Sequence, residues 1–217
     1  MKMLAVEFSS DHRSVAVLDG KNLLAEKTIT EGRNTAAVQL IEETLTAAKT
    51  SRPEIECIAV GIGPGSYTGI RAAIALTQGW QLAAGVKVQA ADSLEALALG
   101  RQIAGDRGEI TFAVDAARGE FYLAKFELKN GGVRKIEPTR LAQRDEFEAL
   151  LESSQPVIGP SLAGKYPAVM EQFPSAEFVG RLAARRVEFV EASELEPVYL
   201  RQVDFVKAPP LREIPPA

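Results

Sequence analysis

The sequence predicts an α/β protein made of two successive halves that begin in the same way. Three short strand-like runs open the chain, and alternating helices and strands follow them up to about residue 104. A second set of three strand-like runs begins near residue 110, followed by a helix and another short strand. Because a simple doubly wound domain would start strand–helix–strand, the repeated run of three strands predicts a different architecture.

Hydrophobic periodicity and turn residues locate the elements of the first half. Asp19–Asn22 has the composition of a hairpin turn, Gly85 is placed to end a helix, and Asp92 or Ser93 is placed to begin one. In chain order the expected elements are strands over 4–8, 14–18 and 23–29, a helix over 35–49, a strand over 55–62, a helix over 67–84, a strand over 86–90 and a helix ending near 104.

The second half repeats the order of elements but not the residues, and it is shorter. Its expected elements are strands over 110–115, 119–128 and 133–138, a helix over 145–151, a strand over 156–158 and a helix over 180–191. Three strands followed by alternating helices are the order of a ribonuclease-H-like half, and two in tandem indicate the actin-like ATPase architecture. We expect domains over 1–106 and 107–201, with a proline-rich tail over 202–217.

Composition excludes several functional classes. The 217 residues suffice for a sizeable core, and 46% apolar with 25% charged residues is ordinary for a globular protein. The net charge of -4 and the pI of about 5.3 argue against autonomous RNA binding. Cys57 is the single cysteine, so no intrachain disulfide forms. With no signal peptide and no membrane-length apolar run, we expect a cytoplasmic location.

The most distinctive segment is the glycine turn, which we define as Gly63, Pro64, Gly65, Ser66 and Gly69. A glycine-rich turn between a strand and a helix can present backbone N–H groups to a phosphate. However, the P-loop pattern is absent, and a dinucleotide fingerprint would follow the first strand of its domain. The spacing alone therefore favours a tight turn in which Gly69 permits close packing.

The helix that follows the glycine turn is apolar around most of its circumference. One side can pack on a sheet, and another side needs a second helix. That second helix is either the helix over 35–49 or a helix of another chain, and the pattern does not separate these alternatives. Alanine-rich surfaces of this kind permit close approach between helices.

Acidic residues end the first strand of each half, namely Glu7 and Asp115. In actin-like ATPases such residues hold metal and water, but neither is followed here by an intact phosphate turn. His12 is the single histidine, which excludes a His-Glu-x-x-His zinc protease. We expect His12 to be solvent-exposed, and we expect no metal site.

Several motifs resemble the TsaB (YeaZ) family. Residues 63–71, Gly-Pro-Gly-Ser-Tyr-Thr-Gly-Ile-Arg, are similar to its signature Gly-Pro-Gly-Ser-Phe-Thr-Gly-Leu-Arg. Further matches lie at 92–98, 115–122 and 197–201, the last of which resembles the family's Pro-x-Tyr-Leu-Arg ending. The departures are Glu7-Phe8-Ser9 for the family's Asp-Thr-Ser, Asn34-Thr35 for His-Ser, and Ala117 for arginine.

The resemblance implies a degenerate actin-like ATPase (ASKHA) fold and a non-catalytic scaffold. Its partners would be TsaD, which transfers a threonylcarbamoyl group to the adenosine beside the anticodon of tRNA, and the ATPase TsaE. The chain alone would form a homodimer, and tRNA would be reached only through the complex. We expect no membrane partner, no metal and no cofactor in the chain itself, with ATP or ADP binding only at an interface shared within the complex.

The resemblance also assigns residues. The expected partner-binding surface lies on the helices over 35–49 and 67–84, at Thr35, Val38, Gln39, Glu42, Tyr67, Thr68, Ile70, Arg71, Ala73, Ile74, Leu76, Thr77 and Trp80. A vestigial nucleotide site would comprise Glu7, Ser9, Asp115 and Arg118. The alternatives are a stand-alone actin-like ATPase or kinase, which needs intact phosphate turns, and a dinucleotide-dependent oxidoreductase, which the leading strands oppose.

Overall fold

The computed structural model describes residues 1–30, 37–153 and 155–200, which form two five-stranded sheets. The first sheet contains β1 (Lys2–Glu7), β2 (Arg13–Asp19), β3 (Asn22–Ile29), β4 (Cys57–Gly61) and β5 (Lys87–Ala91). The second contains β6 (Gly108–Asp115), β7 (Glu120–Lys129), β8 (Gly132–Gln143), β9 (Val157–Gly159) and β10 (Met170–Glu171). The helices are α1 (Ala37–Ala47), α2 (Tyr67–Ala84), α3 (Ser93–Ile103), α4 (Arg144–Glu152) and α5 (Ala176–Ala183).

Both sheets have the same topology, which confirms the predicted repeat of element order. The strand orders are β3-β2-β1-β4-β5 and β10-β9-β6-β7-β8, so β1 and β6 hold equivalent central positions. Each pairs antiparallel with the next strand in sequence and parallel with the fourth strand of its sheet. The expected domain boundary near 105–108 falls between α3 and β6.

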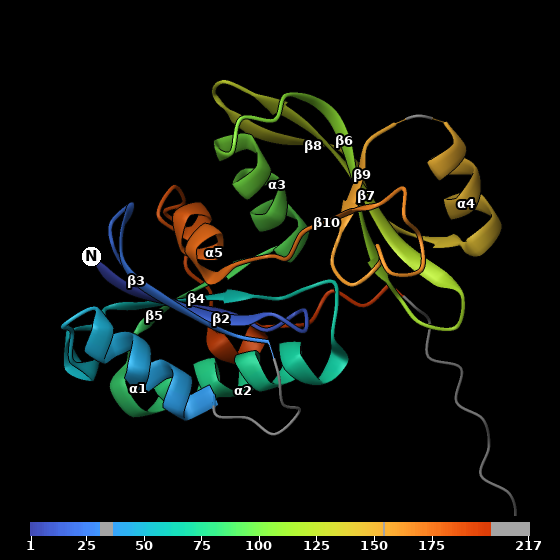
Figure 1. The fold of residues 1–217 in the computed structure, drawn as a ribbon. Helices are drawn as coiled ribbons and strands as arrows, with labels where there is room; N and C mark the ends of the chain where they lie inside the picture. The colour runs from blue at the N-terminus through green and yellow to red at the C-terminus, as the bar shows by residue number, and fades with distance from the viewer. Residues whose placement is uncertain (31–36, 154, 201–217) are drawn as a thin grey trace, which may run out of the picture.

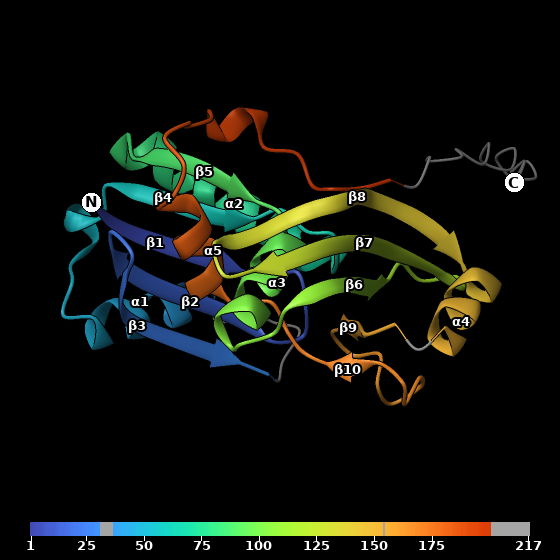
Figure 2. The ribbon, with the colours of Figure 1, turned by 90° about the horizontal axis from the view of Figure 1, so that it is seen from above.

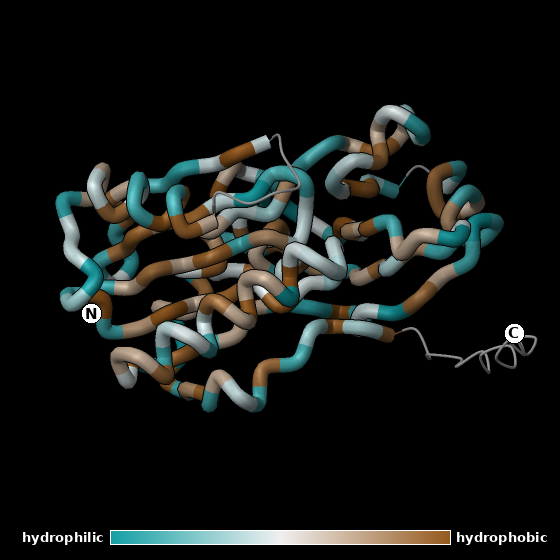
Figure 3. The backbone as a smooth tube through the Cα atoms, turned by 90° about the horizontal axis from the view of Figure 1, so that it is seen from below, coloured by the Kyte–Doolittle hydropathy of each residue, from teal (hydrophilic) through white to brown (hydrophobic). Residues whose placement is uncertain are grey.

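Helices cover both faces of the first sheet (Figures 1 and 2). Along β1, Leu4 and Val6 belong to the hydrophobic cluster that α1 and α2 complete. Met3 and Ala5 point to the opposite face and pack with α3 and α5, as the two-residue period of a strand requires. Figure 3 shows hydrophobic residues along these strands and hydrophilic residues in the surrounding turns.

Helix α3 lies between the two sheets and packs on both. Ala96 and Leu99 join the cluster on the first sheet, whereas Leu97 packs against strands of the second. The far face of the second sheet is covered by α4, where Phe147 stacks on Phe121 of β7 with ring centroids 4.0 Å apart. The two sheets therefore share one interior helix.

Two expected elements differ most in extent from the structure. The last helix was expected over 180–191, but α5 covers Ala176–Ala183. The chain after it lies along the edge of β5 instead, where the Val190 amide donates to the Val88 carbonyl at 2.9 Å. Strand β8 runs beyond 138 to Gln143, because its pairing with β7 continues to Glu120. Its mostly exposed, polar residues gave no apolar alternation from which to predict that length.

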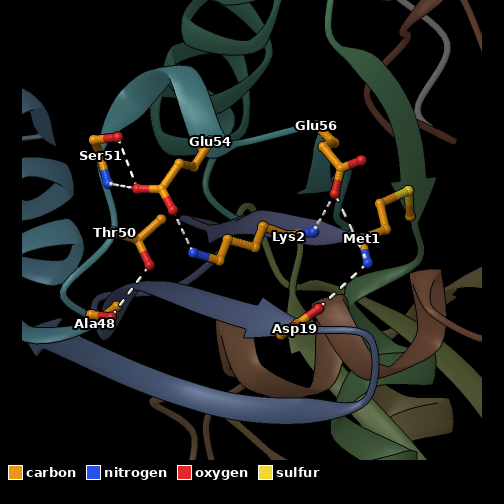
Figure 4. A network of polar contacts seen from close by, with 8 residues as sticks. All are labelled: Met1, Lys2, Asp19, Ala48, Thr50, Ser51, Glu54 and Glu56. Carbon is orange, nitrogen blue, oxygen red and sulfur yellow. Dashed lines mark hydrogen bonds and ion pairs between the residues drawn. The ribbon is translucent and has the colours of Figure 1, made fainter.

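The start of β1 is held by polar contacts at the end of the sheet that lies away from the glycine turn (Figure 4). The Met1 ammonium pairs with Asp19 at 3.3 Å, and the Lys2 amide donates to Glu56 at 2.7 Å. The Lys2 ammonium and groups of Ser51 donate to Glu54, which lowers the pKa of that carboxyl to about 2. These contacts fix the chain where β1, β2 and β4 begin or end.

Candidate functional site

Two hollows in the surface are candidate sites. The helix groove lies between α1 and α2, has a volume of about 770 Å³, and is lined by Val38, Ile41, Arg52, Pro53, Ile55, Ala75, Leu76, Gly79, Trp80, Ala83, Ala84 and Val86. The cleft lies between the two sheets, has a volume of about 920 Å³, and is lined by Ser9, Ser10, Asp11, Gly65, Ser66, Tyr67, Arg71, Val114, Asp115, Ala116, Ala117, Arg118, Glu120, Tyr122, Gln143, Pro160, Ser161 and Tyr199.

The glycine turn is packed directly against the end of β1. A Cβ atom at Gly65 would overlap the carbonyl group of Ser9, and one at Gly69 would overlap the carbonyl oxygen of Phe8. Gly65 also has a φ of 154°, in the region that side chains disfavour. Close packing therefore explains these glycines, as the tight-turn interpretation predicted.

Backbone amides of the turn donate to groups of the protein itself. The Ser66 amide donates to the Ser9 carbonyl at 2.7 Å, and the Gly63 amide donates to the Ser93 hydroxyl at 3.1 Å. The Ser66 hydroxyl caps α2 by accepting from the Gly69 amide at 3.3 Å. These amides are engaged in holding α2 on the first sheet, so they do not form the N–H cradle that a phosphate loop requires.

Glu7 is fully buried beneath the cleft and is not among the residues that line it. One carboxylate oxygen accepts from the Ser9 amide at 2.6 Å, and the other accepts from the Ser93 hydroxyl at 2.7 Å. Burial raises the pKa of the Glu7 carboxyl, against the opposing effect of these hydrogen bonds. The vestigial nucleotide site is therefore split: Ser9, Asp115 and Arg118 line the cleft, but Glu7 does not.

The turn after β6 presents Arg118 to the cleft in a strained conformation. Ala117 and Arg118 have φ values of 61° and 58°, in the left-handed region that residues with a Cβ seldom adopt. The carboxylate of Asp115 accepts from the Ala117 amide at 2.6 Å and so holds the turn. Asp115 is exposed, in contrast to the buried Glu7 at the equivalent end of β1.

The expected partner-binding residues divide by burial. Those that remain exposed or half-buried are Val38, Gln39, Glu42, Tyr67, Thr68, Arg71, Leu76 and Trp80. Ile70, Ala73, Ile74 and Thr77, which were also expected at this surface, are buried in the chain's own structure because they face its sheet. A charge at Ala73 would therefore enter this core and would not test a partner surface. Thr35 lies outside the described residues, as does the tail over 202–217.

The segment after α5 contributes residues that were not predicted for the site. Tyr199 stacks on Tyr67 with ring centroids 5.1 Å apart, and its hydroxyl donates to the Tyr67 carbonyl at 3.2 Å. The Arg71 guanidinium lies over the Tyr67 ring, 4.2 Å from its centroid. Farther along α2, the Gln78 side chain donates to the Ala192 carbonyl at 3.0 Å. The Pro-x-Tyr-Leu-Arg match was the available signal for Tyr199.

His12 is not the exposed side chain expected from the sequence. It is half-buried and stacks on Phe173, with ring centroids 3.5 Å apart. Because Phe173 follows β10, this pair joins the turn between β1 and β2 of the first sheet to the segment after the second sheet. Among the described residues, no group of three or more His, Cys, Asp or Glu side chains is arranged to hold a metal ion, and no helix is long and apolar enough to cross a membrane.

Comparison with known proteins identifies the family. A family model described as TsaD, tRNA N6-adenosine threonylcarbamoyltransferase, matches residues 32–203. The tRNA threonylcarbamoyladenosine biosynthesis protein TsaB of Bacillus subtilis is 30% identical over 73% of this chain and 69% of its own length. The chain belongs to the TsaB family. The Escherichia coli TsaB protein is 26% identical over 93% of this chain and 95% of its own length.

A solved structure agrees with this membership. The structure titled YeaZ from Pseudomonas aeruginosa superposes with a TM-score of 0.78 at 26% identity, covering 92% of this chain and 99% of that chain. The repeated strand order and this likeness confirm the predicted α/β fold of two similar halves, which the present member of the TsaB family shares with YeaZ.

Proposed function

We propose that this chain is a non-catalytic scaffold subunit in the biosynthesis of threonylcarbamoyladenosine in tRNA. In this proposal it binds TsaD through the helix groove, while TsaD transfers the threonylcarbamoyl group to the adenosine beside the anticodon. Membership of the TsaB family, whose curated members are named for this pathway, supports a role of the chain in threonylcarbamoyladenosine biosynthesis. The exposed apolar surface of the groove supports binding of a partner protein as the mode of action.

The composition of the groove is the observation that carries the proposal. Apart from Arg52, every lining residue is apolar or a glycine, and Val38 is 57% exposed. Contiguous apolar surface of this kind marks sites of protein association, because its burial removes apolar area from water. Arg52 lies over the Trp80 ring and also donates to Glu42 at 2.6 Å, which places a charge pair at the rim.

The shape of α2 suits a helical partner. Ala75, Gly79 and Ala83 recur every fourth residue, are all exposed, and therefore share one face of the helix. Small residues on one face allow another helix to approach closely, and neighbouring ridges of side chains can then interlock. We propose that TsaD supplies such helices in the heterodimer and that a second copy of this chain supplies them in a homodimer.

The further partners follow from the family resemblance. We propose that TsaE joins the assembled pair, that ATP or ADP binds only at an interface shared within the complex, and that tRNA is reached through the complex. The net charge of -4 supports indirect contact with tRNA, since a protein that grips RNA alone usually carries a basic face.

The alternative function is a stand-alone ATPase or kinase. The glycine turn argues against it, because the Gly63, Ser66 and Gly69 amides donate within the protein. The burial of Glu7 argues against it as well, since a metal-binding carboxylate needs access to the cleft. ATP turnover by the isolated chain would restore this alternative.

The test compares Val38→Glu with a matched control, Val187→Glu. Val38 is 57% exposed and lines the groove, whereas Val187 is 87% exposed and lies outside it. Burying an unpaired charge at the TsaD contact should weaken association about 100-fold. Light scattering would measure the TsaD complex, and tRNA threonylcarbamoylation would be assayed for each mixture.

The expected result is loss of both complex and activity for Val38→Glu, with Val187→Glu like the wild type. Unfolding temperatures of the two isolated variants would show that each remains folded. Normal association of folded Val38→Glu, or threonylcarbamoyl transfer by this chain without TsaD, would contradict the proposal.

A further inference from the structure

The cleft between the sheets has the size and chemistry of a small-molecule site that is separate from the helix groove. Its volume of about 920 Å³ lies in the range of ligand pockets. Its lining brings together distant parts of the sequence, including the turn after β1, the start of α2, the turn after β6, the segment after β9, and Tyr199 near the end of the described chain. Pockets of this kind usually combine apolar walls with a few convergent polar groups.

Arg71 and Arg118 place two guanidinium groups at this cleft, one on each side. Within the described residues, the Arg71 guanidinium lies over the Tyr67 ring, 4.2 Å from its centroid, and 5.9 Å from the centroid of the Tyr199 ring. Within the described residues, the ion pairs of arginine involve Arg52, Arg101, Arg134, Arg140, Arg181 and Arg186. Both cleft arginines are exposed and can each donate two parallel hydrogen bonds to an anion.

Three carboxylates line the cleft, and each accepts a hydrogen bond from a neutral donor. The Asp11 carboxylate accepts from the Ser161 hydroxyl at 3.2 Å, and Glu120 accepts from the Gln143 side chain at 2.9 Å. Asp115 accepts from an amide of its own turn. Within the part of the chain that the structure describes, no ion pair joins these carboxylates to Arg71 or Arg118. Their negative charge would repel a ligand that carries several negative charges.

Aromatic and apolar side chains supply the rest of the surface. Tyr67 and Tyr199 are stacked at the mouth of the cleft, while Tyr122 and Val114 are buried side chains of its wall. Flat aromatic faces favour a planar ligand body, since offset stacking adds to the burial of apolar area. The strained turn at residues 117–118 fixes where Arg118 enters the cleft.

We propose that the cleft binds a small organic anion with a planar body and a single anionic group, which is held by Arg71 and Arg118. The anionic group is a carboxylate or a phosphate monoester. The carboxylates in the cleft and the internal bonding of the Ser66 and Gly69 amides disfavour a polyphosphate. This inference concerns the isolated chain and does not depend on the binding of TsaD.

The experiment titrates the isolated full-length chain with four probes and follows binding by nuclear magnetic resonance. The probes are benzoate, phenyl phosphate, uncharged benzamide and ATP. Benzoate or phenyl phosphate should bind at least tenfold more tightly than benzamide, because benzamide lacks the negative charge that strengthens a hydrogen bond to arginine. The stronger of the two anions identifies the anionic group as carboxylate or phosphate.

Three variants locate the site. Arg71→Gln and Arg118→Gln should each weaken binding of the preferred anion about tenfold and leave benzamide unchanged. Arg134→Gln is the matched control, because Arg134 lies outside the cleft and pairs with Glu127. Arg71→Lys, which keeps the charge but loses the planar fork, should give an intermediate affinity.

Three results would overturn the proposal. The first is no saturable binding of either anion, and the second is equal weakening by Arg134→Gln. The third is tighter binding of ATP than of both small anions, which would replace the proposed small-anion site with a nucleotide site. Loss of benzamide binding in an arginine variant would indicate a structural effect of that variant, and the other arginine would then decide the assignment.

Discussion

The two sheets share one strand order but differ in what connects their strands. In the first sheet, β4 and β5 are joined by α2, an 18-residue helix that packs on the sheet. In the second sheet, the equivalent strands β9 and β10 are joined by residues 160–169, which contain turns but no helix. The helix groove therefore exists only on the first sheet, although the two sheets have the same topology.

The carboxyl groups at the ends of the equivalent central strands, β1 and β6, also differ between the two sheets. Glu7 is buried and bonded to Ser9 and Ser93, while Asp115 is exposed beside a strained turn. The first carboxyl thus supports the glycine turn, and the second belongs to the cleft wall. One repeated architecture is thus divided between the helix groove, for which we propose a helical partner, and one wall of the cleft, for which we propose a small anion as ligand.

The largest expected effect is on the docking of α2. Gly69→Ala should reduce the free energy of unfolding by about 3 kcal/mol or more, because the new Cβ would overlap the Phe8 carbonyl oxygen. The overlap is between a Cβ atom and a backbone oxygen, and neither can move as the end of a flexible side chain can. Helix α2 would therefore have to shift away from β1. Urea denaturation of the isolated chain measures this effect. A loss below 1 kcal/mol would show that α2 is not locked to the first sheet.

The next-largest expected effect distinguishes the carboxyl group of Glu7 from that of Asp115. Glu7→Ala leaves the Ser9 amide and the Ser93 hydroxyl without their acceptor, which should cost about 2–3 kcal/mol. Asp115→Ala removes the acceptor of one exposed turn and should cost less than about 1 kcal/mol. The same urea measurement compares the two variants. Equal losses of unfolding free energy would show that the buried Glu7 and the exposed Asp115 contribute alike to stability.

Glu7→Gln adds a pH dependence to this comparison. Burial raises the pKa of Glu7 above 4.5, so the folded state binds this proton more tightly than the unfolded state does. Its contribution to stability is therefore fully present below 4.5 and is lost as the pH rises through the raised pKa. Relative to the wild type, Glu7→Gln should gain stability as the pH rises across this window. A parallel pH profile for the two proteins would contradict this assignment.

A smaller effect tests which sheet α5 supports. Although α5 follows the second sheet in sequence, Gly180 packs against Leu18 and Ala5 of the first sheet. Gly180→Ala should cost about 1–2 kcal/mol, because the Leu18 side chain must move to admit a Cβ. Gly164→Ala is the control, since no atom lies within 4 Å of its new Cβ, and it should change stability by about 0.5 kcal/mol or less.

The order of elements was predictable from the sequence because apolar periodicity and turn residues mark it directly. Ser66, Gly85 and Asp92 stand at the ends of α2 and α3 where capping rules predict such residues. The limits of α5 and β8 were not predictable. Residues 186–190 lie along β5 instead of extending α5, and β8 is held by pairing with β7 despite its polar sequence.

The candidate site was predictable only in part, for a related reason. Sequence pattern identifies α2 as apolar on most sides, but it does not show which of these sides the chain itself covers. Ile70 and Ala73 face the first sheet, whereas Gln78 bonds to the segment after α5. Likewise, Glu7 and Asp115 occupy equivalent strand ends, yet only the three-dimensional packing distinguishes a buried carboxyl from an exposed one.

The smallest expected effect also links stability to the proposed partner surface. Gly79 is an exposed residue in the interior of α2, and a Cβ there would meet no atom within 4 Å. Gly79→Ala should therefore stabilise the isolated chain by about 0.5–1 kcal/mol, since glycine loses more backbone freedom than alanine in a helix. If a helix of TsaD packs closely on this face, the same methyl group should weaken the complex. Urea denaturation and light scattering with TsaD would measure these opposite changes, and a stabilised variant that binds TsaD normally would place the closest helix contact away from Gly79.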